Sequence, residues 1–352
     1  MLPPRLVRRL VLAPLTVAVA VALAALFPLL AAAAALAGLA GRARPRPMRG
    51  LRLLWFAVAW LAAETLTLLR CLSLWLASGF GARLHTEPYA RRHYAVMRRL
   101  LGLVYRAGTS AFGVRIEVHE PELTAGEQAA RLARPVIVLS RHAGPGDSVL
   151  LVHHLLTVYQ RRPRLVMKAA MQLDPSVDVL AGRLPNVFVP RRRAGQGVVT
   201  DEIRRLAAGL GADGALVIFP EGGNWTPGRR RRAIRRLQRT GRRDLASRAL
   251  QMPNLLPPRP GGVAAAIGAC PEADVIFVAH AGLDDLLSAG DIWRRMPVHR
   301  LVRARWWRVP ADQVPRAAGH EALVTWLYDW WQRIDEWVSQ NRPVPENVRP
   351  AA

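Results

Sequence analysis

An uncharged segment near the N-terminus sets the strongest limit on what this chain can form. No charged residue occurs from Leu10 to Gly41, a run of 32 residues. A helix of that length, at about 1.5 Å per residue, exceeds the roughly 30 Å hydrocarbon core of a bilayer. The apolar region of a secretory signal peptide is shorter and precedes a small-residue cleavage site. The segment therefore predicts a membrane helix, with a kink expected at Pro28.

A second apolar segment, from Leu53 to Gly81, differs because it contains Glu64 and Arg70. Charges inside a span are costly unless they face protein or water, so this segment is predicted as either an embedded or an interfacial helix. The positive-inside rule selects no orientation, because basic residues precede, separate and follow the two segments. A shallow hairpin in one leaflet of the cytoplasmic membrane would place all of them on one side: Arg5, Arg8 and Arg9, then Arg42, Arg44, Arg46, Arg49 and Arg52, then Arg83, Arg91 and Arg92.

The charge balance points to an anionic partner. The 352 residues include 50 basic and 25 acidic ones, a formal net charge of +25, which suits a membrane surface, a nucleic acid or a phosphate-rich substrate. Lys168 is the only lysine and alanine is abundant, so codon bias explains most of the arginines. Cys71 and Cys270 cannot form a disulfide framework and lie in no metal-ligand spacing, so the catalytic portion is predicted to be cytosolic.

Beyond residue 85, short apolar runs alternate with helical stretches. Val136–Leu139 is continuous and β-branched, as in a strand buried on both faces. Strands that alternate with helices predict an α/β sheet covered by helices. The predicted organisation is a membrane anchor over 1–85, a globular domain over 86–345 and a tail over 346–352. Further strands are expected at 114–118, 165–167, 187–189, 216–219 and 275–278, and helices at 88–109 and 201–210.

The stretch from Ser140 to Ser148 contains the first chemical signal. It follows a predicted buried strand, and open α/β sheets bind ligands at the carboxyl ends of their strands. On a continuous helix His142 and Asp147 would point about 140° apart, but Gly144-Pro145-Gly146 favours a tight turn that folds the carboxylate onto the imidazole. Asp147 is also a suitable N-cap for the apolar helix expected next.

His142 and Asp147 together fit a general base. A carboxylate on one imidazole nitrogen fixes the tautomer and leaves the other nitrogen free to accept a proton. The chain has no Ser or Cys in the context of a nucleophile elbow. His142 is therefore predicted to deprotonate a substrate hydroxyl, which attacks an acyl carbonyl directly. The alternative is a loop histidine beside a capping aspartate.

A second stretch, Phe219 to Thr226, again ends a predicted strand. Its glycines permit close backbone approach, and a strand end is an unusual place for a glutamate that is merely solvated, here Glu221. Taken alone, the stretch could be an ordinary turn.

These two stretches resemble the glycerolipid acyltransferase family, which includes the 1-acylglycerol-3-phosphate acyltransferases. Its members have a His-x4-Asp motif, here His142 and Asp147, followed by a strand ending Phe-Pro-Glu-Gly, here Phe219 to Gly222. The similarity extends to the lysocardiolipin and lysophosphatidylinositol acyltransferase subgroup and covers roughly residues 90 to 340. It implies a central, mostly parallel mixed sheet. The motifs similar to that subgroup are 219–226, 258–262, 297–299 and 326–331.

The resemblance implies roles for individual residues. His142 would be the general base and Asp147 its orienting partner, while Glu221 and Gly222 belong to the acceptor-binding motif. A guanidinium fork suits a phosphate, so an arginine after the strand at 187–189 would hold the acceptor phosphate. The substrate-binding residues implied in addition to the Glu221 motif are Arg191 or Arg192, Lys168 and Arg259.

The substrates also follow from the resemblance. The donor would be acyl-coenzyme A or an acyl-carrier protein, with no metal and no bound cofactor. The acceptor would be 1-acyl-sn-glycerol-3-phosphate, giving phosphatidic acid, or else another lysophospholipid or a glycolipid. Arg141 replaces a usual asparagine and Trp225 stands where many relatives have serine, which bears on the acceptor head group more than on the reaction.

Two further features allow alternative interpretations. Ten of the twenty residues from Arg229 to Arg248 are arginine, which fits anionic lipid headgroups, the phosphates of coenzyme A, or a solvated loop. With Trp306 and Trp307, the arginine runs also motivate a membrane-tethered nucleic-acid-binding protein, although that leaves the ordered motifs unexplained. Helical spacing predicts core packing for Leu323, Trp326, Leu327, Trp330, Ile334, Trp337 and Val338.

Overall fold

The computed structural model describes residues 2–40, 48–120, 124, 126, 133–144, 146–189, 196–284, 290 and 301–342. The chain divides into two compact units. Unit 1 comprises Met1–Val114, Val149–Ala194 and Ile292–His299. Unit 2 comprises Arg115–Ser148, Gly195–Asp291 and Arg300–Ala352. The domain boundaries predicted at residues 85 and 345 stay predictions.

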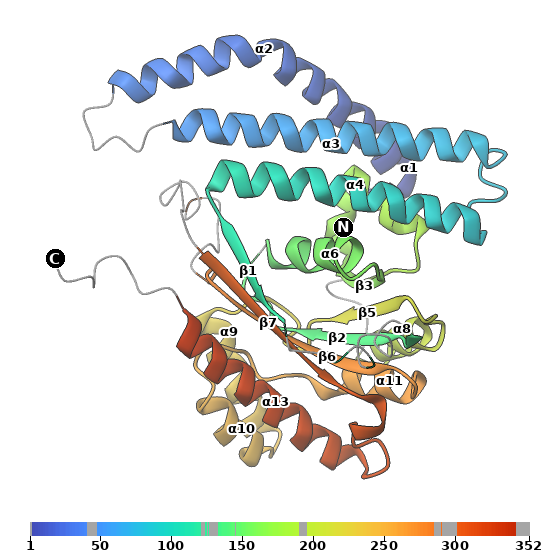
Figure 1. Ribbon diagram of the computed structural model, residues 1–352, viewed down its shortest axis with the longest axis vertical. Coiled ribbons are helices and arrows are strands. Elements are labelled where there is room, and N and C mark those ends of the chain that lie inside the picture. The colour runs from blue at the N-terminus through green and yellow to red at the C-terminus, as the bar shows by residue number, and fades with distance from the viewer. Residues whose placement is uncertain are drawn as a thin grey trace. The chain divides into compact units, whose positions relative to one another are not determined.

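Unit 1 contains the two apolar helices. A short helix α1 (Arg5–Val7) and the π-helical η1 (Arg8–Leu12) lead into α2 (Ala13–Ala40), and α3 (Arg49–Ala77) comes next. By length and composition, Arg5–Leu36 and Arg49–Ala77 could each cross a membrane. Pro28 lies inside α2, and that helix bends along its length in Figure 1.

A third long helix, α4 (Glu87–Phe112), lies along α3. Figure 1 shows α2, α3 and α4 running side by side. At one end of α3 the Arg52 guanidinium donates a hydrogen bond to the carbonyl of Ala111 at 3.4 Å. At the other end the Tyr89 hydroxyl of α4 donates to the carbonyl of Ala77 at 2.6 Å. The two helices are therefore antiparallel and in contact over their full length.

Polar contacts connect the apolar helices to α7 (Pro175–Leu180). Glu64 of α3 is only 3% exposed, and it accepts a hydrogen bond from the Ser176 hydroxyl at 2.9 Å. Asp178 of the same short helix pairs with Arg8 at 2.7 Å and with Arg9 at 3.1 Å. Of the two charged residues in the second apolar segment, Glu64 thus faces protein, which is a condition for burying it, whereas Arg70 is exposed.

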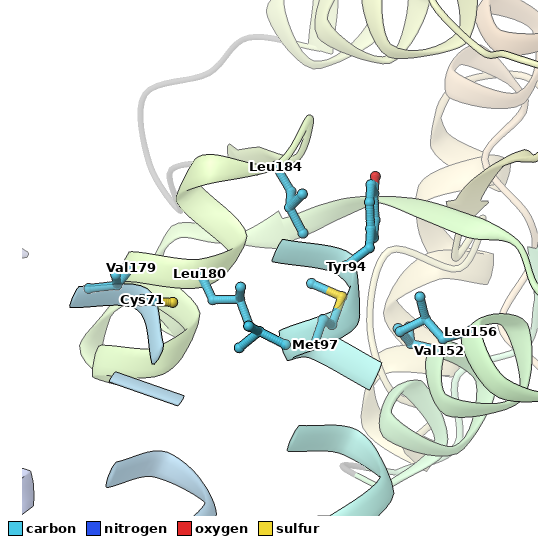
Figure 2. Packing of buried hydrophobic residues seen from close by; sticks show 9 residues of the cluster. Cys71, Tyr94, Met97, Val152, Leu156, Val179, Leu180 and Leu184 are labelled. Carbon is cyan, nitrogen blue, oxygen red and sulfur yellow. The ribbon is translucent and has the colours of Figure 1, made fainter. Parts of the chain in front are cut away.

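The core of unit 1 forms where α3, α4 and α7 meet α6 (Asp147–Thr157), a helix that begins in unit 2. Figure 2 shows Cys71, Tyr94, Met97, Leu156 and Leu180 packed together there. Two parallel strands, β3 (Arg162–Lys168) and β4 (Val187–Val189), complete the unit with the short helices η2 (Ala169–Leu173) and η3 (Ala181–Arg183).

In the part of unit 2 that the structure describes, five strands lie in the order β1-β7-β6-β2-β5. Each neighbouring pair is parallel except β6 and β7, which are antiparallel. All residues of β2 and β5 are buried, as expected for the continuous apolar runs at the centre of a covered sheet. The strands are β1 (Arg115–His119), β2 (Val136–Ser140), β5 (Gly214–Ile218), β6 (Asp274–Ala281) and β7 (Leu301–Val309).

Helices cover this sheet, and the α/β fold with a mostly parallel mixed sheet is confirmed. Leu327, Ile334 and Val338 of α13 are buried, as predicted for the helical stripe. The helices of unit 2 within the described residues are α8 (Gln196–Ala208), α9 (Pro227–Arg239), α10 (Arg243–Leu250), α11 (Pro260–Ala269), η4 (Ala311–Gln313) and α13 (His320–Asn341).

The sequence did not predict β7. Its residues Leu301–Val309 mix arginines with two tryptophans, so neither a continuous apolar run nor a clean alternation marks them as a strand. Trp306 is 6% exposed, and Trp307 packs against Trp330 and Trp337 of α13. Trp306 is therefore buried, and Trp307 is half-buried against α13.

Candidate active site

The loop that contains His142 leaves the carboxyl end of β2, the strand between β5 and β6. His142 Nδ1 lies 2.9 Å from Asp147 Oδ2 and 3.1 Å from Oδ1. The turn predicted from the glycines thus brings imidazole and carboxylate together within unit 2. Pro145, between those glycines, lies outside the described residues.

Asp147 holds the loop as well as the imidazole. Its carboxylate accepts hydrogen bonds from the amides of Ala143 at 2.8 Å, Gly144 at 3.1 Å and Ser148 at 2.6 Å. Asp147 is the first residue of α6, and its carboxylate bonds to the preceding loop and to the adjacent Ser148, whereas an N-cap side chain bonds to amides two or three residues further on. Burial favours a raised pKa for Asp147, yet the hydrogen bond from His142, the nearby His280 and His142 rings and the Gly144 amide together lower the pKa below its usual range. The carboxylate is therefore ionised at neutral pH.

The backbone of His142 is fixed on both sides. Its N–H donates to Glu221 Oε1 at 3.2 Å, and its carbonyl accepts a hydrogen bond from the Trp225 amide at 2.8 Å. The imidazole lies against the Phe219 ring, with 4.6 Å between ring centroids. Its side chain keeps 15% of its surface exposed, and Nε2 has no hydrogen-bond partner in the described part of the chain. A tethered imidazole with one unoccupied nitrogen is suited to accept a proton.

Glu221 connects three segments instead of projecting into solvent. It is 2% exposed, and its second oxygen accepts the amide N–H of Leu256 at 3.2 Å. Burial raises the pKa of Glu221 to about 8, against the lowering effects of the Arg141 charge and of the two amide donors. The carboxylate predicted to bind the acceptor is thus engaged in holding the His142 loop.

Arg141 is a fully buried cation next to the histidine, although the sequence analysis connected it only with the acceptor head group. Its guanidinium donates to the carbonyls of His280 and Asn254 and pairs with Asp284. Burial favours a raised pKa for Asp284, but Arg141, together with the nearby His280 and Arg342, brings the pKa down to about 2. The feature of the sequence that could have indicated a structural role for Arg141 is its position, because a charged residue directly follows an apolar strand.

His280 was also missed as part of this centre. It lies at the end of β6, and its Nε2 is 3.7 Å from Asp147 Oδ2, so Asp147 lies between two imidazoles. Burial, and then the Arg141 charge, lower the pKa of His280 and keep it neutral. The negative charge on Asp147 therefore remains available to His142.

Gly222 and Arg259 are also in contact. Gly222 has a φ of +69°, and a Cβ there would lie 2.9 Å from the Arg259 guanidinium carbon. The Arg259 amide donates to the carbonyl of Pro220 at 2.9 Å. Glycine is therefore required at 222 both by its backbone conformation and by the close approach of the arginine.

The remaining predicted site residues belong to unit 1. Lys168 is the last residue of β3 and pairs in register with Val189, the last residue of β4. Arg191 and Arg192 follow β4 but lie outside the described residues, so their phosphate-binding role stays a prediction. Among the described residues, no group of three or more His, Cys, Asp or Glu is arranged to hold a metal ion.

Comparison with known proteins gives one result. The family model described as Acyltransferase matches residues 115–303, more than half of the chain and the whole stretch from His142 to Arg259. Neither curated proteins nor solved structures gave a match. His142, oriented by Asp147 at the carboxyl end of a central strand, lies within the matched region. Because the match covers more than half of the chain, the chain belongs to the acyltransferase family.

Proposed function

We propose that the protein transfers a fatty acyl group from an acyl thioester to the free hydroxyl of a lysophospholipid, with 1-acyl-sn-glycerol-3-phosphate as acceptor and phosphatidic acid as product. The observation that supports this most is His142, whose Nδ1 is held by Asp147 while Nε2 has no partner among the described residues. Acyl transfer itself is the activity of the family to which the chain belongs.

The reaction requires one base and no covalent enzyme intermediate. His142 Nε2 removes the proton of the acceptor hydroxyl as its oxygen attacks the thioester carbonyl. The tetrahedral intermediate then collapses, the carbon–sulfur bond breaks, and the leaving thiolate takes the proton back from the imidazolium. Asp147 is anionic throughout and stabilises that imidazolium. The step needs no metal and no bound cofactor, and the donor is acyl-coenzyme A or an acyl-carrier protein.

Basic residues are proposed to hold the acceptor phosphate. Arg191 or Arg192, after β4, would form the bidentate contact, with Lys168 at the end of β3 and Arg259 beside Gly222 adding charge. The arginine-rich runs could also bind nucleic acid. A lipid substrate is favoured because Trp306 is buried and Trp307 packs against Trp330 and Trp337 of α13.

A panel of lysolipids tests the proposal directly. The purified full-length protein is incubated with acyl-coenzyme A or acyl-carrier protein and with lysophosphatidate, lysophosphatidylinositol, lysophosphatidylglycerol and a glycolipid, and each product is identified by mass. Phosphatidic acid as the fastest-forming product supports the assignment. Faster acylation of another acceptor would replace lysophosphatidate as the substrate, and release of free fatty acid alone would refute transfer to a lysophospholipid.

We also propose that the apolar helices form a hairpin in one leaflet of the cytoplasmic membrane, with the catalytic part in the cytosol. The contact of α3 with α4 supports this, because a bilayer-crossing α3 would carry the arginines of α4 into the hydrocarbon. A buried guanidinium at the bilayer centre costs at least ~2.5 kcal/mol. The arginines of α4 are Arg91, Arg92, Arg98, Arg99 and Arg106.

A single cysteine can test the hairpin. Cys71 and Cys270 are replaced, and Arg46→Cys is introduced between the two apolar segments. An impermeant maleimide added to intact cells should then leave the new cysteine unlabelled until the membrane is opened. Labelling of intact cells would instead show that both helices cross the bilayer.

A further inference from the structure

A hollow of about 410 Å³ lies in unit 1, between α4 and α6, apart from the residues assigned to acyl transfer. Arg98, Arg99 and Arg106 of α4 line it, together with His153 and Thr157 of α6. No lining residue in the described part of the chain is acidic. The hollow is therefore a concentration of positive charge on a concave surface.

These arginines differ from their neighbours on the same helix. Arg91 of α4 pairs with Glu87, whereas Arg98, Arg99 and Arg106 make no ion pair with any described residue. Their positions are i, i+1 and i+8, so all three project from one face of the helix. Three guanidinium groups that repel one another without an internal counter-charge form a site that an external anion can stabilise.

Gly102 forms the floor between these arginines. It is buried, and a Cβ at this position would lie 3.7 Å from Arg106 Nη1 and 4.0 Å from His153 Cε1. The absence of a side chain at residue 102 thus leaves open space beside the Arg106 guanidinium and the His153 ring. A larger side chain would fill that space while keeping every charge.

His153 closes the other side of the hollow. Its ring stacks on Tyr105, with 4.2 Å between centroids, and its buried Nδ1 has no hydrogen-bond partner among the described residues. Burial, then His154 and Arg106, lower the pKa of His153 to about 4. The ring is therefore neutral at pH 7, so the positive charge of the hollow belongs to the arginines.

We propose that this hollow binds a phosphate group, either of an anionic phospholipid headgroup or of coenzyme A. Guanidinium groups recognise phosphate by paired hydrogen bonds, and a concave surface with little internal counter-charge strengthens that attraction. A lipid source is favoured by α3, which lies along α4 and exposes Trp55, Leu66, Leu69, Leu72 and Leu76. The same unit thus places an apolar surface and a phosphate site on neighbouring helices.

Binding to the full-length protein in a neutral detergent tests the proposal without turnover. Three soluble probes are titrated: dioctanoyl phosphatidylglycerol, dioctanoyl phosphatidylcholine as the zwitterionic control, and coenzyme A. The variant Arg98→Gln/Arg99→Gln/Arg106→Gln should bind phosphatidylglycerol or coenzyme A at least about tenfold more weakly than wild type. Loss of phosphatidylglycerol binding identifies the lipid source, and loss of coenzyme A binding identifies the donor.

Two further variants distinguish binding at the hollow from a general effect of the positive charge of the protein. Arg115→Gln/Arg305→Gln/Arg333→Gln removes the same charge from exposed positions outside the hollow and outside the arginine-rich run 229–248, and it should leave both affinities unchanged. Gly102→Leu fills the floor and should weaken binding although all arginines remain. An equal loss in the Arg115/Arg305/Arg333 variant, unchanged binding in the α4 variant, or full binding by a folded Gly102→Leu protein would each overturn the proposal. Circular dichroism and the thermal midpoint establish folding.

Discussion

Two histidine-containing centres in this chain show how partners determine what the same residue types can do. In unit 2, His142 is held by the Asp147 carboxylate, and the neighbouring Arg141 is buried and paired with Asp284. In unit 1, His153 has no carboxylate partner, and the arginines around it have no acidic partner among the described residues. Burial and charge hold the His153 ring neutral.

The difference separates a proton acceptor from an anion receptor. A carboxylate on one imidazole nitrogen makes the other nitrogen basic and compensates the charge that develops during catalysis. Without that carboxylate, nearby guanidinium groups oppose protonation of the ring and leave positive charge for an external anion. The first centre is therefore suited to chemistry and the second to binding, and four predictions test this contrast.

Removing the His142 side chain should have the largest effect, and that effect is on turnover. His142→Ala should lower kcat at least ~10²-fold, the usual contribution of a general base, while the fold is retained. His154→Ala, on α6, is the matched control and should keep kcat close to that of wild type. Acyl transfer is measured with both substrates saturating. Turnover of His142→Ala within a few-fold of wild type would remove the catalytic role assigned to this centre.

Asp147→Asn should have the next largest effect, about a 10²-fold loss of kcat. An amide cannot compensate the imidazolium, and its NH₂ group would face the Ala143 and Gly144 amides, which are themselves donors. Transfer rates measured from pH 6 to pH 9 should remain low throughout, because no change of pH restores the missing negative charge. Rates within a few-fold of wild type anywhere in that range would show that the negative charge of Asp147 is not needed for the reaction.

The sequence predicted this centre and most of the sheet because the signals are local. Val136–Leu139 is β-branched and continuous, and Gly144-Pro145-Gly146 turns the chain within a few residues. Arg141 and His280 were not predicted as partners, because their contact joins positions 139 residues apart. The hollow in unit 1 depends on α4 meeting α6, and periodicity within either helix does not specify that pairing.

Arg191 and Arg192 are a further pair of basic residues that can sharpen the comparison, because they are proposed to bind the phosphate of the acceptor itself. Neutralising Arg191 and Arg192 together should raise the KM for lysophosphatidate roughly tenfold, about one lost charge-assisted contact, with little change in the KM for the acyl donor. The Arg98/Arg99/Arg106 variant in detergent should not raise the acceptor KM. If both variants raise the two KM values equally, the arginines act as one diffuse basic surface and the distinction between binding sites is lost.

The smallest effect concerns stability against pH, where the two centres should respond with opposite sign. The folded-state pKa of Glu221 is raised from 4.5 to about 8, so the folded protein binds more protons than the unfolded chain between those values. Its contribution to stability therefore falls as pH rises from about 4.5 to about 8. The folded-state pKa of His153 is lowered from 6.5 to about 4, so its contribution rises with pH between about 4 and 6.5.

Replacing each group separately should isolate these slopes. Thermal midpoints in detergent are measured at half-unit steps from pH 5 to pH 8.5 for wild type, Glu221→Gln and His153→Gln. The midpoint of Glu221→Gln relative to wild type should increase steadily up to about pH 8, whatever fixed cost the amide adds at Leu256 and His142. The midpoint of His153→Gln relative to wild type should decrease up to about pH 6.5 and then stay level. A Glu221→Gln curve parallel to wild type would mean that this carboxylate is ionised in the folded protein, and the charge of Arg141 would then have to be shared between Glu221 and Asp284.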